Sequence, residues 1–433
     1  MTKLLHHALA GHDSDAPAIG APERVALTFG GLRALTDKTT ATLNALGVGR
    51  NDRVAIVLPN GPEMAAAFIA ISAGATTAPL NPAYRADEFR FYLEDLNAKA
   101  LIVRADDGSP AVEVARELDI VILTLIPDLA APAGTFSLEG PSAGELRSGG
   151  PAAADDIALV LHTSGTTSRP KIVPLSHTNI ATSARNIGTT LSLTPNDRCL
   201  NIMPLFHIHG LIAAVSASLV AGASVHCTPG FNALRIFGWF EAVQPTWYTA
   251  VPTMHQAILS RAARNKEIVA RMALRFIRSS SSSLPPPVMH DLEDVFGAPV
   301  IESYGMTEAS HQMTSNQLPP GTRKAGSVGA AAGPEVAIMD IAGVLVAQGQ
   351  TGEVVIRGEN VTASYENNPD ANATAFTDGW FRTGDQGILD DEGFLTITGR
   401  LKEIINRGGE KIAPLEVDNA LMAHAAVAQA VTF

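Results

Sequence analysis

The stretch VAIVLPNGPEMAAAFIAISAGATTAPL, residues 54–80, sets a pattern that much of the chain repeats. VAIVL (54–58) is a continuous apolar run of strand length, and TTAPL (76–80) is a second one. Between them, an alanine-rich segment of helical length begins after a turn at 59–62. A strand, a helix and a strand in this order are typical of a parallel sheet with helices on its faces.

The same alternation continues to about residue 312. Ligands of such sheets bind at the carboxyl ends of the strands, so the loops that follow the apolar runs are the candidate site. The Pro-, Gly- and Ser-rich stretch 126–156 is predicted to be a surface linker between two sheet units. The apolar stretch 210–225 is shorter than the roughly 20 residues of a membrane span and is predicted to be a buried helix. Further strands are predicted at 100–103, 157–161, 198–203, 223–227, 246–251, 274–278 and 299–303.

After Pro319 the sequence pattern changes to short segments of alternating apolar and polar residues separated by glycine turns, such as GEVVIRG (352–358) and GFLTITGR (393–400). This pattern predicts an antiparallel β subdomain. The last segment, 401–433, begins another βα unit that is unfinished at Phe433, which indicates a truncated C-terminal domain.

Composition excludes several classes of protein. The 433 residues correspond to about three domains. A net charge of −12 argues against a broad surface for nucleic acid or anionic lipid. Two cysteines exclude a disulfide framework, and the N-terminus is a poor secretory signal. We therefore expect a cytoplasmic protein without a membrane span, and the sequence leaves its oligomeric state open between monomer and homodimer.

LHTSGTTSRPK (161–171) is the most informative segment for chemistry. A loop rich in hydroxyl groups follows a buried strand, and its glycine permits a positive φ. Such a loop, closed by the point charge of Lys171, can form a cradle for an anion. A solvated Ser/Thr turn is the alternative, but the position directly after a core strand favours phosphate binding.

Three more segments carry groups suited to a nucleotide: ESYGMTEASHQ (302–312), GWFRTGD (379–385) and GRLKEIINRGGEKI (399–412). Tyr304 can stack on a base, and Glu308 can hold Mg²⁺ through oxygen. Asp385 can accept the hydroxyls of a ribose. Taken alone, Glu308 or Lys402 would be an ordinary solvated charge.

These four segments, in this order, resemble the adenylate-forming superfamily of acyl-CoA synthetases. The resemblance covers nearly the whole chain and implies activation of a small carboxylic acid by ATP and Mg²⁺, followed by transfer to the thiol of coenzyme A. It also implies an α/β fold in which residues 1–398 form a large adenylating domain. This domain has two parallel-sheet αβ subdomains and a small antiparallel β-barrel-like subdomain. A hinge at 399–402 and the incomplete beginning of a lid domain at 403–433 would follow.

The resemblance implies roles position by position. Lys402 would be the hinge about which the lid rotates, while Thr307 would touch the α-phosphate and Glu308 would bind Mg²⁺. Gly408 and Gly409 would lie beside the tunnel for coenzyme A. The residues implied to bind ATP are Thr163, Ser164, Gly165, Thr166, Thr167, Lys171, Ser281, Ser282, Ser283, Glu302, Ser303, Tyr304, Asp385 and Arg400.

Two departures from the superfamily pattern stand out. Ser168 and Ile172 occupy positions where most members have glycine, and Ile172 does not easily adopt a positive φ. The superfamily's adenylating lysine would lie beyond Phe433, so weak adenylation is expected of this chain alone.

The segments expected to select the acid contain His207, His209, Arg278, five consecutive serines and His311. A fatty-acid pocket should be apolar, at roughly 0.8 kcal/mol per buried CH₂. A second carboxylate near ATP instead needs donors or cations. The amino-acid sequences of these segments resemble the oxalate–CoA ligase branch most. This resemblance implies that His209, Ser281 and His311 donate hydrogen bonds to oxalate and that His207 is a gate beside the acyl pocket. Either His207 or His209 could instead be a hydrogen-bonded core histidine.

The sequence therefore predicts an acid–CoA ligase acting on oxalate. Alternatives that remain are a malonyl-CoA or a medium- or long-chain acyl-CoA synthetase, and, outside enzymes, a nucleotide-binding protein that has lost catalysis.

Overall fold

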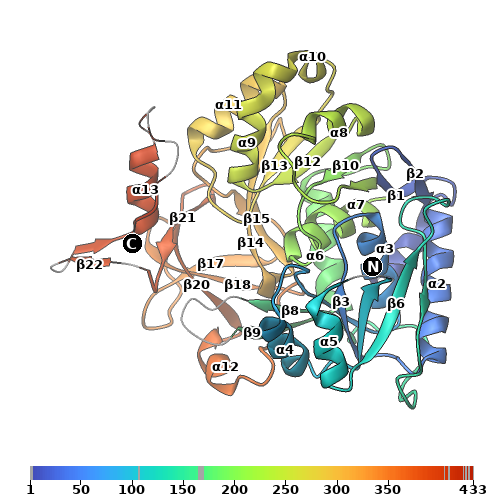
Figure 1. The fold of residues 1–433 in the computed structure, drawn as a ribbon. Helices are drawn as coiled ribbons and strands as arrows, with labels where there is room; N and C mark the ends of the chain where they lie inside the picture. Colours follow the sequence, from blue (N-terminus) through green and yellow to red (C-terminus); the bar gives the residue numbers. More distant parts are fainter. Residues whose placement is uncertain are drawn as a thin grey trace.

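The structure is a computed structural model that describes residues 3–105, 108–163, 170–403, 405–407, 410–422, 424, 427 and 430–432. Two large sheets share a layer of buried helices, and a smaller antiparallel sheet lies beside them (Figure 1). This arrangement confirms the predicted α/β class with two parallel-sheet units and an antiparallel subdomain.

The first large sheet has seven strands in the order β7-β6-β5-β3-β4-β8-β9. Its inner strands are parallel, and the edge strands β7 and β9 run antiparallel to their neighbours. Its strands are β3 (Arg53–Val57), β4 (Thr76–Pro79), β5 (Ala100–Arg104), β6 (Val121–Pro127), β7 (Phe136–Glu139), β8 (Ile157–Thr163) and β9 (Lys171–Ser176).

The second large sheet has nine strands in the order β16-β15-β14-β13-β12-β10-β11-β1-β2. The strands from β14 to β1 are parallel, so the carboxyl ends of β10, β12, β13 and β14 meet at one edge. Its strands are β1 (Pro17–Ala21), β2 (Arg24–Thr28), β10 (Arg198–Asn201), β11 (Ser224–Cys227), β12 (Trp247–Ala250), β13 (Phe276–Ser279), β14 (Val300–Met306), β15 (His311–Ser315) and β16 (Ala330–Ala331).

One continuous hydrophobic core joins the two sheets. Helix α3 (Pro62–Ser72) is apolar around almost its whole circumference, and Phe68 and Ile71 are fully buried, as expected of a helix packed on every side. Figure 1 places α3, α6 (His177–Thr190) and α7 (Ala217–Val220) between the strands of the two sheets. The predicted helix at 210–225 is confirmed up to Val220, as a buried π-helical segment, His209–Ser216, followed by α7, whereas residues 224 and 225 belong to β11.

The remaining helices cover the outer faces of the sheets or connect strands. Side-chain caps fix some of their starts; for example, the Thr28 hydroxyl accepts from Gly31 N at the start of α2. These helices are α1 (Leu5–Ala8), α2 (Phe29–Ala45), α4 (Ala86–Asp95), α5 (Pro110–Glu117), α8 (Ile236–Val243), α9 (Pro252–Ala262), α10 (Lys266–Val269), α11 (Pro286–Phe296), α12 (Pro369–Ala375) and α13 (Pro414–Met422), with 3₁₀ turns at Leu9–Gly11, Ala263–Asn265 and Thr307–Ala309.

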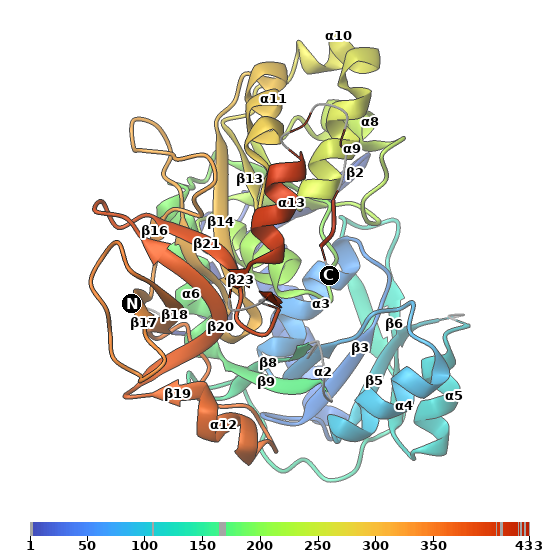
Figure 2. The ribbon, with the colours of Figure 1, turned by 90° about the vertical axis from the view of Figure 1, so that its left-hand side faces the viewer.

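The antiparallel subdomain has the strand order β17-β18-β20-β19, with β21 paired to β20. A hairpin, β22 (Ile405–Arg407) and β23 (Glu410–Ile412), precedes α13, which lies beside β21 (Figure 2). The unit after residue 401 therefore begins with a hairpin and a helix, where a single βα unit was predicted. The subdomain strands are β17 (Glu335–Met339), β18 (Thr351–Arg357), β19 (Phe376–Thr377), β20 (Trp380–Leu389) and β21 (Leu395–Arg400).

The prediction that 126–156 links two sheet units is wrong. β6 extends to Pro127, β7 pairs with it, and β8 then pairs with β4 of the same seven-stranded sheet. Loops rich in Pro and Gly lie on either side of β7, so the sequence around this edge strand resembles a linker. The sheet to which a strand belongs is decided by its pairing partner, which the local sequence does not show. Among the described residues, no helix has both the length and the apolarity that crossing a membrane requires.

Candidate active site

The β8–β9 hairpin holds the two ends of the predicted phosphate loop. Thr163 at the end of β8 pairs with Lys171 at the start of β9, so the two side chains flank the mouth of the hairpin. Ser164, Gly165, Thr166 and Thr167 lie outside the described residues. Ile172 is buried in β9 opposite His162 and has no positive φ, so this departure from the superfamily pattern is accommodated in a strand.

Glu308 lies in the 3₁₀ turn Thr307–Ala309, directly after β14, and its side chain is buried. The Tyr365 hydroxyl donates to Glu308 Oε1 at 2.7 Å, and Lys171 Nζ lies 4.3 Å from the centroid of the Tyr365 ring. Burial raises the pKa of Glu308, whereas its bond from Tyr365 and the charge of Lys171 oppose this shift. The fold therefore brings together Lys171 and Glu308, which are far apart in sequence.

A second acid, Asp385 on β20, is also buried and lies between two donors. The Tyr304 hydroxyl donates to Asp385 Oδ2, and Arg400 Nε donates to Oδ1 at 3.1 Å. Burial raises the pKa of Asp385, and the bonds from Tyr304 and Arg400 counteract it. β14, β20 and β21 thus place the three residues predicted for adenine and ribose in one cluster.

The loop after β13 carries the predicted serines. Glu302 Oε1 accepts from Leu284 N at 2.8 Å and so ties this loop to β14. Glu302 Oε2 is buried without a partner among the described residues, and burial raises the pKa of this carboxyl to about 7. The carbonyl of Ser303 accepts from the Ser280 hydroxyl at 2.9 Å. Ser281 and Ser282 are exposed, and Ser283 is half-buried.

The predicted acid-binding residues meet at the carboxyl ends of β12, β13 and β14. His209, the first residue of the π-helical segment, is buried. Its Nδ1 lies 2.9 Å from Ser281 Oγ, and its Nε2 lies 2.6 Å from Thr249 Oγ1. The rings of His209 and His311 meet edge to face, with their centroids 4.9 Å apart.

His311 is buried, and neither of its ring nitrogens has a hydrogen-bond partner among the described residues. Burial lowers the pKa of His311 well below its ordinary value, and the charge of Arg278 adds to this effect. The backbone of His311 has a positive φ of 99°, a conformation that stores strain in a non-glycine residue. A Cβ at Gly305 would lie 1.8 Å from the carbonyl oxygen of His311, so glycine is required at position 305.

His207 lies apart from this cluster. Its side chain is exposed, and its ring contacts Phe206, with the ring centroids 4.5 Å apart. Asn60 anchors the preceding loop, because its amide donates to the Met203 carbonyl and its Oδ1 accepts from Leu205 N. The described contacts of His207 therefore differ from those of His209, and its role as a gate stays a prediction.

Lys402 is exposed in the turn that follows β21. Its charge is close enough to Lys171 to help lower the pKa of Lys171, for which burial is the main cause. The predicted hinge at 399–402 therefore lies beside the predicted phosphate site. Gly408 and Gly409 lie outside the described residues.

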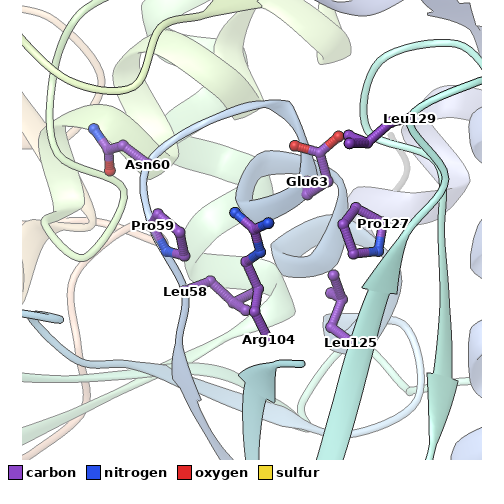
Figure 3. Close-up of a pocket in the computed structure, with 8 residues that line it drawn as sticks. All are labelled: Leu58, Pro59, Asn60, Glu63, Arg104, Leu125, Pro127 and Leu129. Carbon is purple, nitrogen blue, oxygen red and sulfur yellow. The ribbon is translucent and has the colours of Figure 1, made fainter. Parts of the chain in front are cut away.

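A small cavity at the carboxyl ends of β3, β5 and β6 is separate from this site (Figure 3). Its volume of about 60 Å³ is far below the few hundred Å³ of a typical ligand pocket. Arg104 extends into it between Pro59 and Pro127 (Figure 3). None of the residues predicted to bind ATP or the acid lines it.

The residues at Glu308 fit a magnesium ion. No cluster of three or more His, Cys, Asp or Glu side chains suited to a metal occurs among the described residues. Mg²⁺ in nucleotide sites takes one or two carboxylates, and phosphate and water oxygens complete its shell. A single buried carboxylate facing Lys171 and the mouth of the phosphate hairpin suits that mode of binding.

The chain belongs to the AMP-binding enzyme family, whose profile matches residues 5–366. Within this family it is an AMP-forming acid–CoA ligase, a class that uses ATP with Mg²⁺ and coenzyme A and acts on a carboxylic acid.

Two relatives and one solved structure illustrate the similarity. An oxalate–CoA ligase of Arabidopsis thaliana is 46% identical over 429 residues, which cover 97% of this chain and 82% of the relative. An oxalate–CoA ligase of Saccharomyces cerevisiae is 43% identical over 411 residues, which cover 89% and 75%. The structure of ATP-bound MatB from Rhodopseudomonas palustris matches with a TM-score of 0.88 at 29% identity, over 100% of this chain and 85% of that one.

The sequence did not assign roles to several residues that complete the site. Tyr365 reaches Glu308 across 57 positions, and nothing local in the sequence marks it. Thr249 and Arg278 contact His209, and Gln312 accepts from Arg278. Arg278 does carry a signal, since a charged residue at the end of an apolar strand run is rarely buried without a reason.

Proposed function

We propose that this acid–CoA ligase acts on oxalate. One carboxylate oxygen of oxalate attacks the α-phosphorus of ATP, forming an O–P bond while the bond to the β-phosphate oxygen breaks and pyrophosphate leaves. The thiolate of coenzyme A then attacks the acyl carbon, forming the thioester and releasing AMP. Both steps need positioning and neutralisation of charge more than a protein nucleophile.

The observation that carries the choice of acid is His311. Its two ring nitrogens are buried without partners among the described residues, and a buried polar atom without a partner costs about 1–3 kcal/mol. A second carboxylate on the acid would accept a hydrogen bond from the ring nitrogen that carries the proton. The methylene groups of a medium- or long-chain acid would instead contact the ring nitrogens of His311. They offer no hydrogen bond, so the free-energy cost of the unpartnered nitrogens would remain.

Charge supports the same choice. A second carboxylate 4 Å from another negative group costs about 4 kcal/mol at an effective dielectric constant near 20. The groups that perturb His311 electrostatically are Arg278 and His209, and neither is acidic. Ser281 and His311 would then donate to the distal carboxylate, His209 would act on it through its hydrogen bond to Ser281, and His207 would gate the acyl pocket. Two relatives named oxalate–CoA ligase add support.

The nucleotide roles follow the positions described above. Lys171 with the loop from Thr163 to Thr167 would hold the β- and γ-phosphates, and Thr307 the α-phosphate. Asp385 and Arg400 would hold the ribose and Tyr304 the adenine, whose edge Ser281, Ser282, Ser283, Glu302 and Ser303 would line. Glu308 would hold Mg²⁺, which neutralises phosphate charge when bound. Residues 1–398 would form the adenylating domain, 399–402 the hinge with Lys402, and 403–433 the start of a lid in which Gly408 and Gly409 face coenzyme A.

The test is the substrate profile of the full-length protein with oxalate, malonate, acetate and octanoate in the presence of ATP, Mg²⁺ and coenzyme A. We expect oxalate to give the highest kcat/KM, and a preference for octanoate or acetate would reject the proposal.

Binding measurements give a second test. Ser281→Ala and His311→Ala should each weaken oxalate binding by about tenfold or more, since each removes a hydrogen bond to a charged group. His226→Ala, which removes a half-buried histidine from β11, is the matched control and should leave oxalate affinity unchanged. Unchanged affinity in both test variants would end the assignment of these donors.

A further inference from the structure

Arg278 is a fully buried cation at the heart of the nine-stranded sheet. It lies on β13 in register with Thr249 of β12 and Ile301 of β14, and its side chain is 0% exposed. No ion pair joins it to a carboxylate within the part of the chain that the structure describes. The residues that the structure describes therefore leave the charge of this guanidinium unbalanced.

The hydrogen bonds of Arg278 are few and long. Nη1 lies 3.5 Å from both His209 Nε2 and Thr249 Oγ1, and Nη2 lies 3.4 Å from Gln312 Oε1. Nε has no partner among the described residues. Burial lowers the pKa of Arg278 to about 9, which still leaves it charged at neutral pH. A buried charge without a counter-ion is costly, and a bound anion would remove that cost.

Arg278 also fixes the direction of the hydrogen bonds around His209. A guanidinium donates hydrogen bonds and never accepts them. A proton on His209 Nε2 would place its N–H beside the N–H groups of Arg278 Nη1 at 3.5 Å, so the arrangement favours Nε2 as an acceptor, with the Thr249 hydroxyl 2.6 Å away as its donor. His209 then carries its proton on Nδ1 and donates to Ser281 Oγ at 2.9 Å.

The chain of donors thus runs from the interior to the surface. Arg278 is buried, His209 is buried, and Ser281 at the far end is exposed, with a positive φ of 73°. Because Ser281 Oγ accepts from His209, its own O–H is free to donate outward. An anion at this end would meet a hydroxyl donor, and it would lie in the field of an unbalanced cation.

We propose that Arg278 is the positioning residue that makes this site select small acids with two negative charges. It directs the Ser281 hydroxyl toward the distal carboxylate through Thr249 and His209, and its charge balances the second charge of the substrate. This inference rests on the proposed oxalate–CoA ligase function and adds a residue to it. It assigns to Arg278 the discrimination between a diacid and a monoacid of equal size.

The experiment compares oxalate with oxamate, in which a neutral amide replaces one carboxylate. Dissociation constants are measured for the full-length protein and for Arg278→Met and Arg278→Lys, with an ATP analogue that cannot transfer AMP. Arg278→Met should weaken oxalate binding by roughly 100-fold, the effect expected when one member of a buried charge pair is removed. Oxamate binding should change less than threefold, and Arg278→Lys should recover most of the oxalate affinity.

Stability and tautomer give readouts that a purely structural role would not produce. Without ligand, Arg278→Met should melt at the same temperature as the unmodified protein or higher, because an unbalanced charge has been removed. Nitrogen-15 shifts of histidine should place the His209 proton on Nδ1 and show that it redistributes in Arg278→Met. Equal losses for both acids, or a lower melting temperature with an unchanged tautomer, would overturn the inference.

The outcome for the unmodified protein separates the two proposals. If it activates malonate and not oxalate, the oxalate proposal fails, and the same comparison with malonate and its monoamide still tests Arg278. If it activates oxalate and Arg278→Met retains the preference for oxalate over oxamate, the role of Arg278 fails and the proposed function stands.

Discussion

The nucleotide side and the acid side of the site differ in whether their buried charged side chains have partners in the protein. On the nucleotide side, Asp385 accepts from Arg400 and Tyr304, and Glu308 lies beside Lys171 and accepts from Tyr365. On the acid side, Arg278 has no acidic partner among the described residues.

The difference follows from what each side must bind. ATP binds together with Mg²⁺ and makes several contacts along its length. The protein can therefore bind it with side chains that are already paired with one another, and these side chains keep their partners when ATP is absent. The proposed substrate, a two-carbon diacid, offers few contacts, so most of its binding free energy must come from groups left unsatisfied in its absence. Such groups lower the stability of the empty protein, which is a common cost of function.

The largest effect should come from Glu308→Gln, which removes the metal-binding charge and keeps the shape of the side chain. We expect kcat/KM to fall by about 1,000-fold for every acid alike, measured as ATP–pyrophosphate exchange in the full-length protein. Tyr365→Phe removes only the hydroxyl that donates to Glu308 and should cost about tenfold. A loss confined to oxalate would break the comparison, because it would place Glu308 on the acid side.

Gly305→Ala should act mainly on the acid side. The added Cβ would overlap the carbonyl oxygen of His311, so the His311 ring must move. A displacement of about 1 Å costs roughly 100-fold at a precisely positioned site, and we expect this loss in kcat/KM for oxalate. ATP binding, measured separately by calorimetry, should change far less, and circular dichroism checks the fold. Equal losses in both measurements would contradict the division into two sides.

Thr249→Val interrupts the donor chain at its middle. The hydroxyl 2.6 Å from His209 Nε2 disappears, and we expect about a tenfold loss of oxalate affinity. Thr249→Ser keeps the hydroxyl and is the matched control, which should bind oxalate nearly as well as the unmodified protein. Equal oxalate affinities in the Thr249→Val and Thr249→Ser variants would show that oxalate binding does not depend on the hydrogen bonds from Arg278 to Ser281.

Glu302→Gln tests the exception, a buried acid on the nucleotide side whose Oε2 has no partner among the described residues. Its folded-state pKa of about 7 lies above the ordinary 4.5, so the folded protein keeps a proton that the unfolded chain releases. The stability from this group is present below pH 4.5 and is lost as pH rises through 7, by about 3 kcal/mol in total. Glu302→Gln should therefore melt higher than the unmodified protein at pH 8.5, and the difference should vanish near pH 4.5. Parallel melting curves at both pH values would contradict this.

Much of the fold follows from local sequence. Runs such as VAIVL and IALVL are apolar on every residue because parallel strands are covered on both faces, so these strands were predicted where they lie. β7 was missed because FSLE is an edge strand with alternating burial inside a Pro- and Gly-rich region. Pairing with β6 decides its structure, and local sequence does not encode that partner.

The site was predictable from sequence where its residues lie in one contiguous motif. It was less predictable where the fold brings together residues that are distant in sequence. His209 and His311 lie 102 positions apart, and the expectation that they act together came from resemblance; the structure places their rings in contact. Arg278 was noted among the residues of the acid-selecting segments, but its isolation from acids emerges only from the packed sheet. The same holds for the contact of Tyr365 with Glu308.

The β14–β15 hairpin carries Glu308 in its turn and His311 at the first position of β15, and both Ser310 and His311 have a positive φ. The residues proposed for metal binding and for acid choice thus lie within four positions of each other on one hairpin. Attempts to redirect such an enzyme to other acids by randomising this turn should mostly yield inactive clones. Libraries built on the β12 and β13 ends, where Thr249, Arg278 and Ser281 lie, leave the metal-binding carboxylate in place and offer the better starting point.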